Sequence, residues 1–395
     1  MRTTTMALWR RDLLQRHTIL LTLCVLTAIP TPAQTLTTLF SFNGANGSGP
    51  SPLAQGRDGN FYGTTNSGGS NNTCYIGCGT VFQITPAGVF TTLYNFDSSR
   101  SGGHYPSGAL TLASNGDFYG VTEEGGPVRC GSSGCGTIFR VTSSGALATV
   151  HGFNDTDGSC PGATPIQAAD GAFYGTTVCG GANKLGTVYR YAPDGTFTLL
   201  ESFDSLNGSS PNGLIQASDG IFYGTTGQGG DGSDVGTIFR MEPGGNLITV
   251  YSFAPKRAYP SAVTQGSDGD FYGTTCGGTL NAGTVFKLTP AGAISTLHQF
   301  SGPDGACPAA ALIQASDGNF YGTAVRGGSG DYGTIFEITP EGVLTTLHSF
   351  MLTDGQGPSA LVQGTDGNFY GTTGLGGANN YGTVFQLSTG LQPPK

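Results

Sequence analysis

The sequence predicts an all-β protein: a seven-bladed β-propeller of four-stranded antiparallel blades, its ring closed by the N-terminal strand. Three observations predict this fold. One short string recurs seven times, each repeat holds only strand and turn signals, and the mature chain begins and ends inside a repeat. A period near 50 residues with strand signals alone is typical of propeller blades or of a large solenoid.

The recurring string, DGxFYGTT in its commonest form, sets the repeat. Its phenylalanines are Phe61, Phe118, Phe173, Phe222, Phe271, Phe320 and Phe369. The last five are spaced by 49 residues, and the first two intervals are 57 and 55 residues. The composition agrees with many short strands and tight turns, because 68 residues are glycine and only 10% are charged. Glycine supplies the positive φ angles that such turns need.

Each repeat contains four strand-like runs, named a to d here in chain order. In the last repeat, strand a is expected at 358–364, strand b at 368–373 and strand c at 383–387. Strand d is the TTLHSF type, as at 345–350. An Asp-Gly pair joins a to b, which is a strong signal for a two-residue hairpin. Segments such as TPAG at 289–292 join c to d and read as proline-initiated turns.

The phase of the repeat predicts how the ring closes. The mature chain starts with a d-type run at 36–42 and ends with a c-type run at 382–387. The last blade therefore lacks its own strand d, and we expect the N-terminus to supply it. Such closure removes exposed sheet edges. An open solenoid would end in atypical capping repeats instead.

The repeated G-T-V-F-x-[LI]-T-P-x-G, T-T-L-x-x-F and D-G-x-F-Y-G-T-T, followed by G-G, resembles the GloVer tandem repeat of exported bacterial proteins, also described as "choice-of-anchor". The resemblance covers residues 35–388. It implies an extracellular or envelope location and no established activity. The tail, STGLQPPK, departs from anchored members because it shows no sorting segment. The strand order is similar to NHL-type propellers, which implies that strand a is innermost.

The N-terminus predicts an export signal. Four arginines (Arg2, Arg10, Arg11 and Arg16) precede an apolar run of 12 residues at 18–29, which is short for a membrane span. Residues 30–33 (PTPA) offer a cleavage site after Ala33. Arg10-Arg11 also resembles a twin-arginine signal, but a chance pair in a basic segment is the preferred interpretation. We therefore expect residues 1–33 to be a signal peptide, 34–390 a single propeller and 391–395 a short tail. The mature protein should be secreted or periplasmic, with no membrane span.

Charge argues against one class of partner. Removal of the signal takes away four arginines and one aspartate, so the formal net charge moves from −9 to −12. An acidic protein without clustered basic residues lacks the positively charged surface that binds nucleic acid.

The eight cysteines of the mature chain predict disulfides, because their number is even and the compartment is oxidising. We expect the pairs Cys74–Cys78 and Cys130–Cys135 within two long b–c loops, and Cys160–Cys179 across strands of the third repeat. Cys276 and Cys307 remain, on the same face of adjacent blades. A four-cysteine zinc site made from the first two loops is the alternative.

Residues that recur in every repeat are expected to serve the fold. The aspartates of the Asp-Gly turns should cap their own turns. The glutamines that end strand a should hydrogen-bond between blades. His151, His298 and His348 share one position in strand d and are expected at the solvated outer edge.

Function should instead come from residues that differ between repeats. They concentrate in the b–c and d–a loops, which share one face of the ring. The candidates for ligand binding are Arg100, His104, Tyr105, Glu123, Glu124, Arg129, Lys256, Arg257 and Tyr259. A mixed charged and aromatic face of this kind suits a ligand platform, although a solvated loop surface is the plain alternative.

No catalytic signature appears in the sequence: the inner strands carry no acid that is unique to one blade, and no familiar nucleophile, metal or phosphate motif occurs. We therefore expect an exported, monomeric, non-catalytic binding or structural propeller with no cofactor and no metal, whose partner is a glycan, peptide or protein. The alternative is an extracellular hydrolase or lyase that uses Glu123, Glu124 and His104 in acid–base roles. A spacer without a ligand is a third interpretation.

Overall fold

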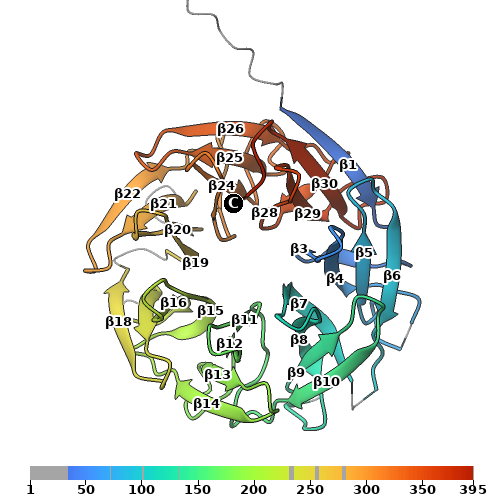
Figure 1. The fold of residues 1–395 in the computed structure, drawn as a ribbon, viewed down its shortest axis with the longest axis vertical. Coiled ribbons are helices and arrows are strands. Elements are labelled where there is room, and N and C mark those ends of the chain that lie inside the picture. Colours follow the sequence, from blue (N-terminus) through green and yellow to red (C-terminus); the bar gives the residue numbers. More distant parts are fainter. Residues whose placement is uncertain are drawn as a thin grey trace, which may run out of the picture. The chain divides into compact units, whose positions relative to one another are not determined.

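The structure is a computed structural model that describes residues 34–394 except 72, 100–101, 132, 231–234, 254–257 and 278–281. The predicted signal peptide lies outside the described residues. Residues Gln34–Lys395 form one compact unit. In it, seven antiparallel sheets stand in a ring (Figure 1), and no helix occurs in the part of the chain that is described. The predicted seven-bladed all-β propeller is confirmed.

The strands follow the predicted order a-b-c-d in every blade, with strand a at the axis and strand d outermost (Figure 1). The a strands are β2 (Ser48–Pro50) with β3 (Ala54–Gln55), β7 (Gly103–Leu112), β11 (Ile166–Gln167), β15 (Ser209–Gln216), β19 (Pro260–Gln265), β23 (Ile313–Gln314), and β27 (Gln356–Pro358) with β28 (Val362–Gln363). The b strands are β4 (Phe61–Ser67), β8 (Phe118–Gly125), β12 (Phe173–Thr177), β16 (Phe222–Gln228), β20 (Phe271–Thr275), β24 (Phe320–Ala324) and β29 (Phe369–Leu375). The c strands are β5 (Thr80–Ile84), β9 (Thr137–Val141), β13 (Thr187–Tyr191), β17 (Thr237–Met241), β21 (Thr284–Leu288), β25 (Thr334–Ile338) and β30 (Thr383–Ser388). The d strands are β6 (Phe90–Asn95), β10 (Leu147–Gly152), β14 (Phe197–Ser202), β18 (Leu247–Ser252), β22 (Ile294–Gln299), β26 (Leu344–Ser349) and β1 (Thr35–Ser41).

The predicted ring closure is confirmed. Strand β1 pairs antiparallel with β30, from Thr35 opposite Ser388 to Ser41 opposite Thr383. It also reaches the next blade, because the ring of Phe40 stacks on Phe90 of β6 with centroids 4.0 Å apart. One N-terminal strand thus completes blade 7 and packs against blade 1.

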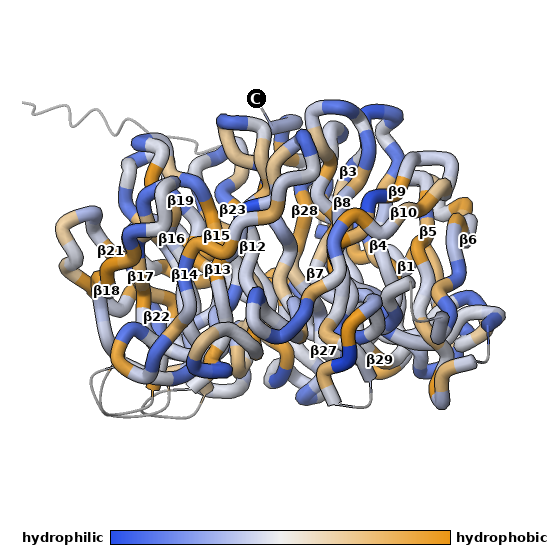
Figure 2. Tube along the Cα trace, turned by 90° about the horizontal axis from the view of Figure 1, so that it is seen from below, coloured by the Kyte–Doolittle hydropathy of each residue, from blue (hydrophilic) through white to orange (hydrophobic). Residues whose placement is uncertain are grey.

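The two faces of the ring differ in the connections they carry. The turn face holds the a–b and c–d turns, and the loop face holds the b–c and d–a loops. In the side view of Figure 2, β28 lies towards the edge that carries the C-terminus and β27 towards the opposite edge. Strand a therefore runs from the loop face to the turn face.

The Phe-Tyr pair of the repeat joins neighbouring blades. In every blade the tyrosine ring of strand b packs on the phenylalanine of the next blade, with centroids 4.0 to 4.5 Å apart. The pairs are Tyr62–Phe118, Tyr119–Phe173, Tyr174–Phe222, Tyr223–Phe271, Tyr272–Phe320, Tyr321–Phe369 and Tyr370–Phe61. The glycine that follows each pair lies beneath a c-strand ring: a Cβ on Gly371 would be 2.5 Å from Phe385.

A glycine–proline contact closes each blade interface on the loop face. Gly382, just before β30, has a φ of +95°, and a Cβ there would lie 2.7 Å from Cδ of Pro50 in blade 1. The residue before the proline is also in the left-handed region, and at Tyr105 its N–H donates to the carbonyl of Cys78 at 3.0 Å. The equivalent contacts are Gly79–Pro106, Gly136–Pro161, Gly186–Pro211, Gly236–Pro260, Gly283–Pro308 and Gly333–Pro358.

The polar residues of the repeat have the structural roles that were expected. Asp366 accepts the N–H of Asn368 at 3.1 Å, which caps its own turn, and also the hydroxyl of Tyr370 at 2.7 Å. Gln55 accepts the N–H of Thr365 in blade 7 at 2.9 Å, so the glutamine does bridge two blades. These groups hold the fold and are not candidates for a cation site.

The d-strand histidines are less solvated than expected. Each is partly buried and paired with an aspartate of the following d–a loop: His151–Asp157 at 3.3 Å, His298–Asp304 at 2.8 Å and His348–Asp354 at 3.0 Å. The reason is that the same aspartates cap the loop, as where Asp304 accepts the N–H of Ser301. The three pairs are therefore structural. The histidines do lie in the outermost strands, but the expectation that they are solvated is corrected, because they support the d–a loops.

Three disulfides brace the loop face: Cys74–Cys78, Cys130–Cys135 and Cys276–Cys307. The first two are the predicted pairs and leave no thiolate for the zinc alternative. The third links strand b of blade 5 to the loop that enters blade 6. Disulfides are typical of proteins in an oxidising compartment such as the periplasm or the extracellular space.

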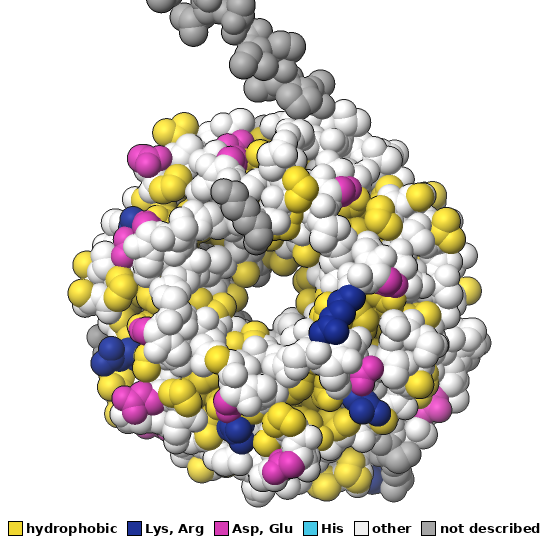
Figure 3. Space-filling view, in the orientation of Figure 1, with side chains coloured by type: hydrophobic (Ala, Val, Ile, Leu, Met, Phe, Trp, Pro, Cys, Tyr) yellow, Lys and Arg dark blue, Asp and Glu magenta, His cyan; other side chains and the backbone are white. Residues whose placement is uncertain are grey.

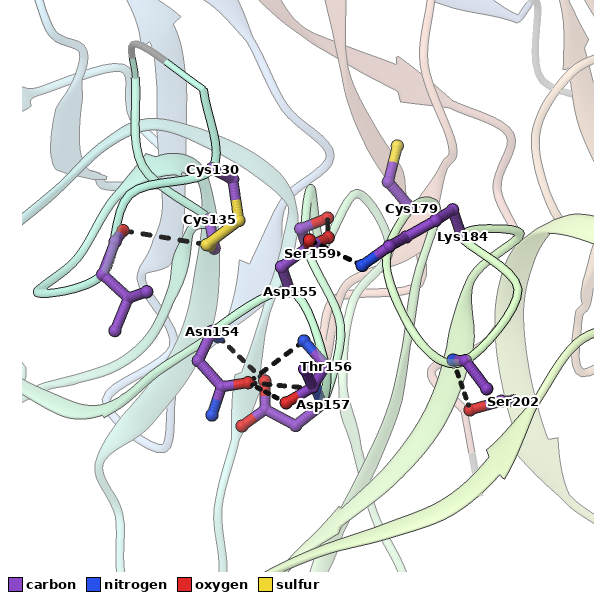
Figure 4. Close-up of polar contacts among 12 residues, drawn as sticks. Cys130, Cys135, Asn154, Asp155, Thr156, Asp157, Ser159, Cys179, Lys184 and Ser202 are labelled. Carbon is purple, nitrogen blue, oxygen red and sulfur yellow. Dashed lines mark hydrogen bonds and ion pairs between the residues drawn. A yellow bond between two sulfur atoms is a disulfide. The ribbon is translucent and has the colours of Figure 1, made fainter.

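The expected third pair is not a disulfide in this structure: Cys160 and Cys179 are free thiols. The backbone does bring them together, because Ser159 and Cys179 form a bridge; Figure 4 shows Cys179 beside Ser159 and the neighbouring Cys130–Cys135 disulfide. Burial, helped by a hydrogen bond with the Cys179 thiol, raises the pKa of Cys160 to about 11.

Among the residues that the structure describes, no helix has the length and apolar character needed to cross a membrane.

Candidate functional site

The axial channel is built by the a strands and has a volume of about 590 Å³. Figure 3 looks down it from the side that carries the C-terminal residues and shows the opening at the centre of the ring. Its lining is small and mostly apolar, with residues such as Ala310, Val263 and Ile215, and none of the described lining residues is ionisable. Acid–base chemistry in this protein therefore has to be placed outside the channel.

The loop face of blade 2 brings a histidine and a carboxylate together. Strands β7 and β8 extend further towards this face than most of their counterparts, and His104 lies directly opposite Glu124 in their register. The two side chains share one side of the sheet, with His104 Nε2 3.4 Å from Glu124 Oε2. The histidine side chain is 12% exposed and the glutamate 37%, so the carboxylate is the member of the pair that solvent or a ligand can reach.

The surroundings of His104 favour one tautomer. Its Nδ1 is buried without a hydrogen-bond partner, while Nε2 faces the carboxylate. A proton on Nδ1 would be a buried, unsatisfied donor, which costs about 1–3 kcal/mol. A proton on Nε2 instead donates towards Glu124. His104 thus orients the Glu124 carboxylate from its less exposed side.

A cleft of about 550 Å³ opens beside this pair. It lies between the d–a loop of blade 1 and the b–c loop of blade 2, and His104, Tyr105 and Arg129 are among its lining residues. Tyr105 has a φ of +56°, and its ring meets that of His104 edge-on at 5.0 Å. Burial and the charge of Glu124 raise the pKa of the Tyr105 hydroxyl, so it remains a proton donor at neutral pH.

Glu123 does not belong to the group of side chains formed by His104, Glu124 and Tyr105. Successive residues of a strand point to opposite faces of the sheet, so Glu123 turns away from the cleft. It faces Ser107 and blade 3, where it lies near Cys160. Although Glu123 is exposed, desolvation by the surrounding protein and the negative charge of Glu124 raise its pKa, while a hydrogen bond with Ser107 lowers it. The expectation that both glutamates act together is therefore corrected.

The other predicted site residues are distributed around the ring. Tyr259 lies in blade 5, where its carbonyl accepts the N–H of Cys276 at 3.1 Å, remote in sequence and blade from His104. Arg100, Lys256 and Arg257 lie outside the described residues. Sequence reasoning missed Thr73 and Ser99, which also line the cleft. Nothing in their sequence context separates them from other loop hydroxyls.

The chain belongs to the Gloeobacter/Verrucomicrobia repeat family, whose model matches residues 24–132, 128–261 and 236–392. This is the family that the repeated pattern indicated. A comparison with curated proteins found no match.

Solved propellers resemble the whole ring. A streptogramin B lyase has a TM-score of 0.63 at 17% identity, with 90% of this chain and 97% of that chain covered. A catalytically inactive histidine-to-alanine variant of virginiamycin B lyase from Staphylococcus aureus, with quinupristin, has a TM-score of 0.65 at 16% identity, covering 90% and 99%. At such identities the likeness establishes the fold alone.

These neighbours nevertheless overturn the expectation of a non-catalytic binding or structural propeller. Both are lyases, and they favour the alternative interpretation, an extracellular hydrolase or lyase. His104 and Glu124, 20 residues apart in sequence, are brought together by the strand register of β7 and β8, so no local motif marks the pair.

Proposed function

We propose that this Gloeobacter/Verrucomicrobia-repeat protein is an exported lyase or hydrolase whose reacting carboxylate is Glu124. The observation that carries the proposal is the pairing of Glu124 with the partly buried His104, which lines a cleft of about 550 Å³; Glu124 adjoins this cleft through His104 and is not itself one of its lining residues. A carboxylate that is 37% exposed and is oriented by a neighbouring imidazole is a suitable general base.

The side chains around the cleft suggest a division of roles. Glu124 accepts a proton, and His104 is a positioning residue that holds the carboxylate. Tyr105 can donate a proton to a leaving group, because its hydroxyl stays protonated. Arg129 can stabilise negative charge that develops on a substrate oxygen.

Two reactions fit this set of groups. In a lyase, Glu124 removes a proton from a carbon beside a carbonyl, the electron pair of that C–H bond forms a C=C bond, and the leaving group departs with a proton from Tyr105. In a hydrolase, Glu124 removes a proton from water and the hydroxide adds to the carbonyl carbon; the tetrahedral adduct then collapses, the bond to the leaving group breaks, and that group departs with a proton from Tyr105. The structural neighbours are lyases, and one is inactive without a histidine, which supports testing elimination first.

A substrate screen tests the proposal. The mature protein is incubated with quinupristin, with acidic and neutral polysaccharides, and with simple esters, and products are followed by mass spectrometry. Elimination breaks a ring or chain without adding water, whereas hydrolysis adds one water to the products. We expect turnover with at least one substrate and its loss in His104→Ala.

His348→Ala is the matched control, because His348 makes the same kind of carboxylate pair at 3.0 Å with Asp354 but lies in a d strand. It should keep full activity. Equal activity of the two variants, or no turnover on any substrate, would count against the proposed site.

We also propose that the chain is exported with residues 1–33 removed. The basic and apolar N-terminal segment and the three disulfides support this. Mass spectrometry of protein from the native secreting cell should show an N-terminus at Gln34. A mature N-terminus upstream of the apolar run would contradict the assignment.

A further inference from the structure

A second hollow on the loop face, of about 800 Å³, lies between blades 7 and 1. Three loops form it: the d–a loop that follows β1, the b–c loop of blade 1, and the b–c loop of blade 7. Its lining includes Ser48, Ser67, Ser70, Tyr75 and Tyr381. None of its described lining residues is charged, in a chain whose net charge is −9.

The floor of this groove is closely packed backbone. Gly69 donates its N–H to the carbonyl of Gly44 at 2.9 Å, and a Cβ on Gly68 would lie 2.4 Å from the same carbonyl oxygen. Glycine is required here because the loops touch through their main chains.

Two tyrosines stand at the sides of the floor. Tyr381 is 42% exposed, and its ring lies against Gly44, where a Cβ would be 3.1 Å from the ring. Tyr75 is fully exposed at 101%. It sits inside the loop closed by the Cys74–Cys78 disulfide, and the neighbouring Ile76 carbonyl accepts the N–H of Gly68 at 2.9 Å. The ring of Tyr75 is thus fully accessible to a ligand, on a loop held by a disulfide.

We propose that this groove binds a neutral oligosaccharide, with Tyr75 and Tyr381 as stacking platforms. A pyranose ring presents an apolar C–H face, which packs on an aromatic ring, and a rim of hydroxyls, which needs hydrogen-bond partners. Tyrosine provides both an apolar face and a polar handle. The hydroxyls of Ser48, Ser67 and Ser70 supply further partners along the groove.

The lack of charged residues in the described lining of the groove distinguishes between classes of polymeric ligand. An anionic glycan or an acidic peptide would need a cationic partner, and the groove lining contains no arginine or lysine. A basic peptide would need a carboxylate, and the lining contains none. Uncharged hydroxyls and aromatic rings match a neutral sugar chain.

The groove also adjoins the proposed catalytic cleft. Cys74 lines both hollows, so the b–c loop of blade 1 is their common wall. A sugar chain held at Tyr75 would extend over this wall towards Glu124. This extension, which makes the oligosaccharide part of the substrate, rests on the proposed function, whereas binding in the groove does not.

The experiment measures binding of the mature protein to soluble neutral oligosaccharides (cello-, malto-, xylo- and chito-oligosaccharides) by calorimetry. We expect at least one series to bind, and Tyr75→Ala to weaken it by about tenfold or more, as expected for a central aromatic anchor. Tyr75→Phe keeps the ring and should bind within about threefold of wild type. Because Tyr75 is fully exposed, these variants should melt at the wild-type temperature.

Leu206→Ala is the control for loss of an exposed apolar side chain, since Leu206 is 71% exposed in a loop of another blade. It should leave affinity unchanged. The proposal is overturned if none of the four series binds, or if binding is the same in Tyr75→Ala as in wild type. Binding is also measured with Glu124→Gln. If binding depends on Tyr75 but the wild-type protein turns over no substrate, the proposed enzymatic activity is rejected and the proposed binding groove stands.

Discussion

Removal of residues 34–42 should unfold or aggregate the mature protein, because β1 is the outer strand of blade 7. The deletion takes away the pairing with β30 and the fully buried side chain of Phe42. It also exposes Phe90 of blade 1, on which Phe40 stacks. Each Leu or Phe that loses its burial costs about 1.5–3 kcal/mol. The loss of the buried Phe42 and of the partly buried Leu36, Leu39 and Phe40 is therefore large against the stability of a typical domain, about 5–15 kcal/mol.

Thermal melting of the purified mature protein checks this result. Thr37→Ala, an exposed position in the same strand, is the control and should melt within about 1 °C of wild type, since exposed substitutions usually change little. A truncated protein that melts at the temperature of the full-length mature chain would show that β1 does not close the ring.

Glu124→Gln should lower kcat by about 10²–10⁴-fold, the usual contribution of a general base. Glutamine keeps the shape of the side chain and can still accept a hydrogen bond from His104, but it cannot take up a proton. Because the two residues form one unit, His104→Ala combined with Glu124→Gln should be little worse than Glu124→Gln alone. Rate measurements on a substrate found by the screen test both statements. Additive losses would indicate that His104 acts independently.

The fold was predictable because the residues that form its strands, turns and contacts between blades recur seven times in the sequence. The Phe-Tyr pairs stack between blades, and the phase of the chain at 36–42 and 382–387 gave the closure by β1. The role of the glycine before each c strand was not foreseen. That glycine meets a proline of the next blade, a contact that becomes visible only when the blades are placed side by side.

The candidate site was predictable only in part. The loop face and the residues His104, Tyr105 and Arg129 were found because they break the repeat, and one cleft does collect them. The division between Glu123 and Glu124 depends on the register of β7 with β8, which places His104 opposite Glu124 and which no sequence pattern specifies. Tyr75 was missed, although an aromatic residue between two cysteines four apart was a usable signal.

The most direct test of the proposed function compares kcat of Glu124→Gln and Glu123→Gln on the same substrate. The two glutamates are adjacent in sequence and carry the same charge, but only Glu124 pairs with His104 beside the cleft. We predict a fall of about 100-fold or more for Glu124→Gln and a change within about threefold for Glu123→Gln. Equal losses in the two variants, or a larger loss in Glu123→Gln, would contradict the assignment of the reacting carboxylate.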